Sequence, residues 1–294
     1  MRKELILPVT AIVGGAIGFF LRRQELLAAF EPDTGLPIEG MPVTWALIAL
    51  SVVVAAVVFL LCLGVGKGFE GGYDEAFQAK DTAPYMMGMT AGAFLTAAAG
   101  ALLLLKLPGL YAEASLETGG FPMFSLVPMA LLSVLCLCSA WSMLMLGKNN
   151  YRGEGKGKYS AWLLIPAYTC CMWLIVSYQE HSGDPIILDY VYQIFAVIAA
   201  VLGCYFLSGF GFGRGRPAAA AFFSAEAMYF ALVTLADAHE QAFLLLYAGC
   251  FFYFAASAVA LLHNLGRPLG PRMPGGKRLS TDEKINREER PHEG

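Results

Sequence analysis

Long apolar stretches, broken by short polar segments, dominate the chain. Eight stretches of about 20 mostly apolar residues are each long enough to cross a bilayer core as a helix. They cover residues 5–21, 42–63, 83–105, 121–146, 159–178, 187–208, 217–236 and 242–262. The runs are continuously apolar rather than alternating, which excludes a transmembrane β-barrel. The pattern therefore predicts an all-α, polytopic membrane protein with eight transmembrane helices in four hairpins.

The first stretch also has the basic start of a secretory signal, at Arg2 and Lys3. It lacks a small-x-small cleavage site and ends in Phe19-Phe20-Leu21-Arg22-Arg23. We therefore interpret it as a retained first helix.

The distribution of basic residues predicts the orientation of the helices. If both termini are cytoplasmic, 17 of the 20 Lys and Arg residues fall in inner segments and 3 in outer ones. This asymmetry follows the positive-inside rule, so both termini are predicted to be cytoplasmic. The weak point is the pair Arg22 and Arg23, which balances Arg2 and Lys3 across the first helix.

The composition excludes several classes of protein. Only 15% of the 294 residues are charged, and 57% are hydrophobic, whereas an ordinary soluble protein is about 25% charged. These values exclude a soluble globular enzyme and a disordered protein. A net charge of −3 gives no basic field for phosphates, so nucleic acid is not an expected partner. The lipid bilayer is the expected partner, and the short loops are typical of the inner membrane of a bacterial cell.

Residues 263–294 follow the last apolar stretch and differ from it in character. Four prolines follow Arg267, and no apolar stripe is present. This composition predicts a cytoplasmic, mostly disordered tail attached to an eight-helix bundle that covers residues 1–262.

Glu226 is the acidic residue that lies deepest in any predicted helix. Arg216 precedes it by ten residues and Asp237 follows by eleven, which at about 1.5 Å per residue places the carboxyl near mid-bilayer. A charge there is unfavourable, so the side chain should face the bundle interior and carry a partner or a proton. Tyr229 lies one turn away on the same face. Two interpretations stay open: a coupling site for a proton or small cation, or a protonated glutamate that only joins helices.

A second candidate site lies toward the outer ends of the fifth and sixth predicted helices. Its members are polar or aromatic: Tyr168, Trp173, Asp189, Tyr190, Tyr192 and Gln193. A carboxylate among aromatic rings would suit an organic cation in an outward-facing vestibule. Tyrosine and tryptophan also gather at membrane interfaces as belts, which is the alternative interpretation.

Small residues recur at four-residue steps in two predicted helices. They are Gly14 and Gly18 in the first helix, and Gly88, Gly92, Thr96 and Gly100 in the third. Such stripes let helix backbones approach closely. We expect them to pack against other helices, either of the same chain or of a second subunit.

The seven cysteines all lie within or beside predicted helices, so no extracellular disulfide framework is indicated. Cys136 and Cys138 lie at a depth similar to that of Cys170 and Cys171. Soft-metal binding between them is one interpretation, and burial as small apolar side chains is the default. No metal site or cofactor is predicted, since histidines are nearly absent from the helices and haem ligands of matching depth are missing.

Two classes of function remain open from the sequence, and enzyme activity ranks third because no known catalytic motif is present. The first is a small proton- or cation-coupled transporter that uses Glu226. The second is a non-transporting membrane module: an assembly factor, sensor or anchor subunit. Such a module would act through helix contacts and its tail, with a membrane protein partner or a second copy of the chain.

Overall fold

The computed structural model describes residues 3–31, 36–66, 69, 71–118, 123–153, 160–183 and 186–265. These residues are almost entirely helical. The elements are α1 (Lys3–Ala28), α2 (Pro42–Cys62), α3 (Tyr73–Phe77), α4 (Ala83–Thr118), α5 (Met123–Arg152), α6 (Ser160–His181), α7 (Ile187–Gly209), the 3₁₀ turn η1 (Phe210–Phe212), α8 (Pro217–Thr234) and α9 (Gln241–Leu265).

Eight of the described helices, all except the short α3, are long and apolar enough to cross a membrane, which confirms the predicted number. The main differences lie at the ends. Helix α4 continues to Thr118 and α5 to Arg152, because polar residues that follow an apolar stretch can continue a helix into the headgroup region. The grouping into hairpins and the orientation of the termini remain predictions. The tail beyond Leu265 lies outside the described residues.

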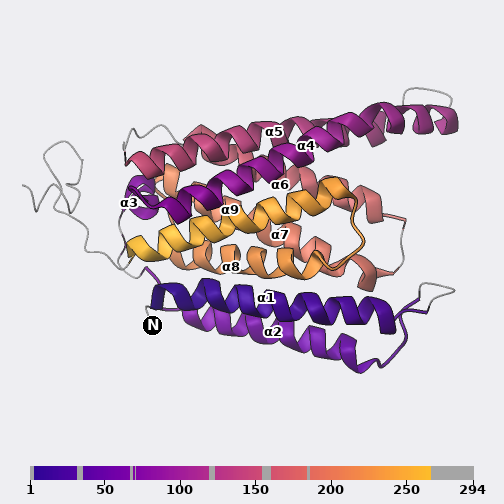
Figure 1. Ribbon diagram of the computed structural model, residues 1–294, viewed down its shortest axis with the longest axis horizontal. Helices are drawn as coiled ribbons and strands as arrows, with labels where there is room; N and C mark the ends of the chain where they lie inside the picture. The colour runs from indigo at the N-terminus through magenta and orange to yellow at the C-terminus, as the bar shows by residue number, and fades with distance from the viewer. Residues whose placement is uncertain are drawn as a thin grey trace, which may run out of the picture.

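Helices α8 and α9 form the centre of the bundle. Helix α8 packs against α1, α2, α7 and α9, and α4 packs between α5 and α9. Figure 1 shows α1 and α2 along one side of α8, with α4 and α5 on the opposite side of the bundle. Within an apolar stretch of 18 residues in each helix, 61% of the residues are buried in α8 and in α9, but only 22% are buried in α2. Since α2 is also the most apolar span, its outer face is suited to lipid.

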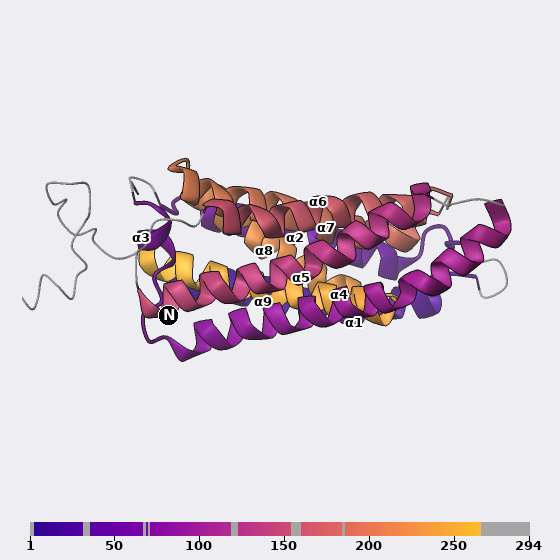
Figure 2. The same ribbon diagram turned by 90° about the horizontal axis from the view of Figure 1, so that it is seen from above.

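Both ends of the described chain lie at one end of the bundle, together with α3 (Figures 1 and 2). Two asparagines hold the α3 region there. Asn150 Nδ2 donates to the hydroxyls of Tyr73 and Tyr85, at 3.1 and 2.7 Å. Asn264 Nδ2 donates to two backbone carbonyls at the end of α3. The opposite end holds the charged residues described next.

Candidate functional site: buried charges along α8

Glu226 lies at the centre of α8, the helix with the largest share of contacts to other spans. Pro217 begins this helix, and the alanine-rich turn that follows allows neighbouring helices to approach closely. The Glu226 side chain is 5% exposed. Its Oε1 atom is buried and has no hydrogen-bond partner. A buried carboxyl oxygen without a partner is unfavourable in the low dielectric of a membrane interior, so a protonated side chain is the more stable form.

Tyr229, one turn further along α8, connects this face to α1 and α2. Its ring is fully buried, and its hydroxyl forms a hydrogen bond of 2.8 Å with Ser51 Oγ of α2. Helix α1 fits against the ring because Gly14 and Gly18 carry no side chain there. A Cβ atom at Gly18 would lie 2.6 Å from Val233 Cγ2 and 3.4 Å from the Tyr229 hydroxyl oxygen. The α1 and α2 helices therefore cover the side of α8 that carries Tyr229.

A cluster of buried charges lies where α1, α7 and the turn between α8 and α9 meet. Arg22 is 0% exposed. Its Nε donates to Asp237 Oδ1 at 2.6 Å, and its Nη1 donates to Glu25 Oε2 at 2.8 Å. The remaining N–H groups reach the carbonyls of Leu188 and Asp189, at 3.1 and 2.6 Å. The guanidinium is thus held by three segments that are far apart in the sequence.

His239 and Thr234 extend this cluster toward α9. Thr234 Oγ1 donates to Asp237 Oδ2 at 2.9 Å. The imidazole of His239 carries a proton on Nε2, because the Thr234 carbonyl oxygen 2.6 Å away can only accept. The ring also packs on Tyr247, with centroids 4.7 Å apart. Burial lowers the pKa of His239 despite the nearby Asp237 carboxylate, so the imidazole is neutral at physiological pH.

The cluster contains one more carboxylate than it has cations. Burial raises the pKa of Asp237, although Arg22 and Thr234 oppose this shift. Glu25 is 0% exposed, and its Oε1 has no hydrogen-bond partner. With Arg22 charged and both acids ionised, the buried group carries a net charge of −1. Because an uncompensated charge is unfavourable there, the cluster favours binding of a proton or a small cation.

Tyr192 lies beside this cluster. Its ring is buried, and the Arg22 guanidinium carbon lies 5.2 Å from the ring centroid. It is also close enough to Tyr229 for an electrostatic interaction between the two hydroxyls, and Tyr229 interacts in the same way with Glu226. Both tyrosines are buried, and the Tyr229 hydroxyl bonds to Ser51 of α2.

The six residues of the predicted vestibule occupy different environments. Trp173 and Tyr192 are buried, whereas Tyr168 is 59% exposed on the outside of the bundle. Tyr190 packs on His181, with ring centroids 4.5 Å apart. Asp189 has an exposed side chain, and only its backbone carbonyl reaches Arg22. Gln193 is partly buried. The structure brings Tyr192 and the Asp189 backbone together at Arg22, and it does not gather the six side chains around one opening.

The small residues of α4 face two other helices of the chain. A Cβ at Gly88 would lie 3.1 Å from Ala256 Cβ, and one at Gly92 would lie 3.1 Å from the Gly249 carbonyl oxygen, both in α9. Thr96 Oγ1 lies 2.7 Å from the position of a Cβ at Gly249. Gly100 faces Cys136 and Ser133 of α5. These small residues are therefore in contact within the chain.

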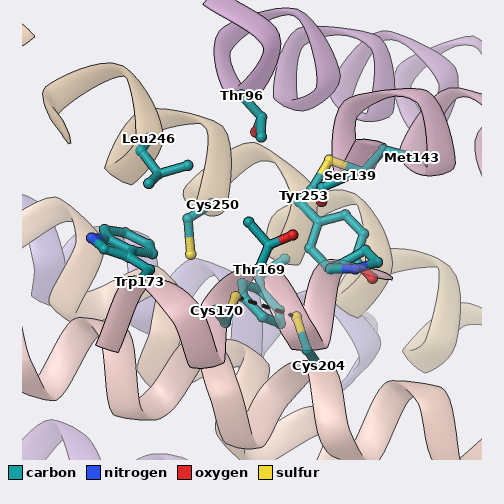
Figure 3. Close-up of a pocket in the computed structure, with 12 residues that line it drawn as sticks. Thr96, Ser139, Met143, Thr169, Cys170, Trp173, Cys204, Leu246, Cys250 and Tyr253 are labelled. Carbon is teal, nitrogen blue, oxygen red and sulfur yellow. Dashed lines mark hydrogen bonds between the residues drawn. The ribbon is translucent and has the colours of Figure 1, made fainter. Parts of the chain in front are cut away.

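A small cavity of about 20 Å³, large enough for roughly one water molecule, lies among α4, α5, α6, α7 and α9. Figure 3 shows the thiols of Cys170, Cys204 and Cys250 along its wall, with Trp173 on one side and Met143 on another. Glu226 does not line it. Within the part of the chain that the structure describes, no group of three or more His, Cys, Asp or Glu residues has the arrangement of a metal site.

The charge cluster is not predicted from the sequence, where Arg22 and Arg23 follow the first apolar stretch and count among the outer basic residues. One signal in the sequence could have located it. Gly14, Gly18 and Arg22 are spaced four residues apart and so share one face of α1. The face that packs through glycines against α8 is therefore the face that carries Arg22 inward.

Comparisons with known proteins find no match among protein-family profiles, characterised proteins or solved structures. The chain is a multi-pass membrane protein. This conclusion rests on the eight long apolar helices, and any more specific function has to be argued from the buried charges.

Proposed function

We propose that this protein is a small proton- or cation-coupled transporter in which Glu226 is the coupling site. The observation that carries the proposal is the unpartnered carboxyl oxygen of Glu226, buried at the centre of a membrane-spanning helix. A glutamate that only joined two helices would place its oxygens on a partner. An oxygen without one is available to a proton that arrives and leaves during a transport cycle.

The buried residues around Glu226 support a route for such a proton. The cluster of Arg22, Glu25 and Asp237 lies at one end of the bundle and favours an added positive charge. Tyr192, whose ring lies beside the Arg22 guanidinium, and Tyr229, one turn from Glu226 in α8, would form the steps between the two sites. Tyrosine hydroxyls both donate and accept hydrogen bonds, so they can pass a proton between buried groups.

A movement of the α1 and α2 helices would expose Glu226. They contact the bundle mainly through α8, and α1 also touches α9. We propose that a displacement of these two helices opens Glu226 to one side of the membrane. The short loops support a bacterial inner membrane as the proposed location, and the distribution of Lys and Arg supports two cytoplasmic termini.

The proposal is tested with protein reconstituted in liposomes. An inward proton gradient is applied, and proton entry is followed with an internal pH-sensitive dye. Infrared difference spectra in parallel record the carboxyl band of a protonated buried acid. Glu226→Gln should remove both the pH-dependent flux and the carboxyl band. Asp189→Asn, which changes an exposed carboxylate, serves as the matched control and should retain both.

A second variant tests the route. Tyr229→Phe removes the hydroxyl and keeps the ring, so it should slow proton entry several-fold while the Glu226 carboxyl band persists. Tyr168→Phe makes the same change at an exposed tyrosine and should have no effect. Flux that is unchanged in Glu226→Gln at every pH would remove Glu226 from the mechanism.

The alternative of a non-transporting module has less support from the contacts. Its expected partner surfaces included the small-residue faces, and in the described helices these faces pack against α8, α9, α5 and α2 of the same chain. Two results would favour the module instead. They are a second protein that co-purifies with this chain in equal amounts, and the absence of proton flux in liposomes that contain it.

A further inference from the structure

We propose that the cavity among α4, α5, α6, α7 and α9 is a binding site for a soft monovalent metal ion, with Cys170 and Cys204 as its chelating pair. The two thiol sulfurs lie 3.8 Å apart. They come from two different helices, and both residues line the cavity. The site is separate from Glu226, and the inference does not rest on the proposed transport activity.

The separation of the two sulfurs fits a shared ion. A zinc–thiolate bond is about 2.3 Å long. With a bond of that length, two sulfurs 3.8 Å apart would bind one ion with an angle of about 110° at the metal, which suits a site with a third ligand. The pair therefore needs little movement of the helices to become a chelate. Within the described residues no third acidic, histidine or cysteine side chain completes a group of three, which disfavours Zn²⁺ and its four ligands.

The other sulfur atoms at the cavity favour a soft ion. Cys250 lines the same cavity as Cys170, and Figure 3 shows its thiol turned toward the pair. Met143 contributes a thioether to the wall. Thiolates and thioethers select Cu(I) over Mg²⁺, Ca²⁺ or Na⁺. A third ligand from Cys250 would complete a three-coordinate site after a change of its rotamer.

Charge balance in the cavity favours a monovalent ion. When one ion M⁺ binds, one thiol loses its proton, the metal–sulfur bond forms, and the proton leaves the cavity. The product of M⁺ and one thiolate is neutral, and the second sulfur can bind as a neutral thiol. A divalent ion would leave a net charge in an apolar interior, which is unfavourable. Cu(I), or Ag(I) as its redox-inert analogue, is the ion that the site fits.

A buried polar atom provides independent support for a ligand in this cavity. Ser139 lines the cavity and is 1% exposed, and its Oγ has no hydrogen-bond partner. Buried polar groups are rarely left without partners. A bound ion that carries a water or another polar ligand would bring a group within reach of this hydroxyl.

The test measures Ag(I) binding to the full-length protein in detergent. Wild type should bind close to one equivalent against a competing thiol chelator of known affinity. Cys170→Ser and Cys204→Ser should each lower the affinity at least tenfold, and Cys250→Ser less. Cys62→Ser changes a buried cysteine of α2, outside the cavity, and serves as the matched control, with unchanged binding expected.

Thermal melting of each variant without metal separates loss of the site from loss of the fold, and Cys170→Ala provides a second variant should serine disturb the packing. X-ray absorption of the Cu(I) complex should show two or three sulfur neighbours bonded to the metal. Binding that persists in the Cys170→Ser, Cys204→Ser double variant, or that falls equally in Cys62→Ser, would overturn the proposal. Since Glu226→Gln should bind silver normally, this result is independent of the transport proposal.

Discussion

Arg22 and Asp237 are 215 positions apart in the chain, and their side chains form a buried ion pair with an Nε to Oδ1 distance of 2.6 Å. This contact joins α1 to the turn between α8 and α9. It lies at the opposite end of the bundle from α3, on the same side of α8 that Tyr229 and the α1 glycines occupy. The stability of the α1 attachment should therefore depend on it.

We expect Arg22→Met to destabilise the protein by about 3–5 kcal/mol, because the change leaves two buried carboxylates without their cation. Asp237→Asn should cost much less. The amide oxygen can still accept from Arg22 Nε, and one positive and one negative charge remain. Chemical unfolding in mixed micelles measures both. Arg23→Met is the matched control, since Arg23 is exposed, and an equal loss in that variant would contradict the structural role of Arg22.

The contrast between Arg22 and Glu226 shows what a sequence can reveal about such a site. Glu226 was found because it stands about ten residues from either end of an apolar stretch, and only an interior location can accommodate it. Arg22 stands at the end of a stretch beside a second arginine, where the headgroup region is an equally good environment. Its burial depends on Asp237 and on two carbonyls of α7, and distant partners of this kind leave no local signal.

The number of helices could be predicted and the rotation of each helix could not. Spans that are apolar on all sides have no polar face that shows which residues point inward. Trp173 and Tyr168 illustrate this, because both are aromatic residues in α6 and one is 1% exposed while the other is 59% exposed. The predicted vestibule assumed one orientation for both. The Oε1 atoms of Glu226 and Glu25 have no hydrogen-bond partner. This also depends on how the helices pack, so the sequence alone does not show it.

Acidification should destabilise the protein through His239. Burial lowers the pKa of this imidazole in the folded state, so the unfolded state binds the proton more readily. The pKa of a histidine in the unfolded chain is about 6.5. The contribution of His239 to stability is therefore fully present above that pH, and it is lost as the pH falls through the lower pKa of His239 in the folded state. Asp237 has the opposite sign, since its raised pKa stabilises the fold as the pH falls.

His239→Gln isolates the histidine contribution, because glutamine retains an N–H for the Thr234 carbonyl and does not titrate. Melting temperatures measured between pH 7.5 and pH 5 should fall more steeply in wild type than in this variant. The groups that face the imidazole are Asp237, Arg22 and His181, so His181→Gln serves as the control for the second histidine. Parallel curves for wild type and His239→Gln would show that the imidazole does not titrate in this range.

Glycine contacts of α1 and α4 predict where a single methyl group is not tolerated. A Cβ at Gly18 would lie 2.6 Å from Val233 Cγ2, and one at Gly100 would lie 2.9 Å from the Ser133 carbonyl oxygen. Alanine at either position should destabilise the protein by about 1–3 kcal/mol, as is typical of overpacking. Gly109→Ala is the control, because nothing lies within 4 Å of its Cβ position. Unfolding in micelles measures the three variants, and an equal effect at Gly109 would show that helix flexibility rather than packing decides the outcome.

The orientation of the bundle can be tested with reporters inserted at its two ends. Alkaline phosphatase is active only outside the cytoplasm, and green fluorescent protein folds reliably only inside it. Insertion after Gly183, in the turn between α6 and α7, should give phosphatase activity without fluorescence, and insertion after Gly213, between η1 and α8, should give the reverse. The prediction follows from the 17 to 3 division of Lys and Arg between the two sides. If the two insertions gave the opposite results, the Arg22 cluster would lie on the cytoplasmic side, and protons would enter the proposed route toward Glu226 from the cytoplasm.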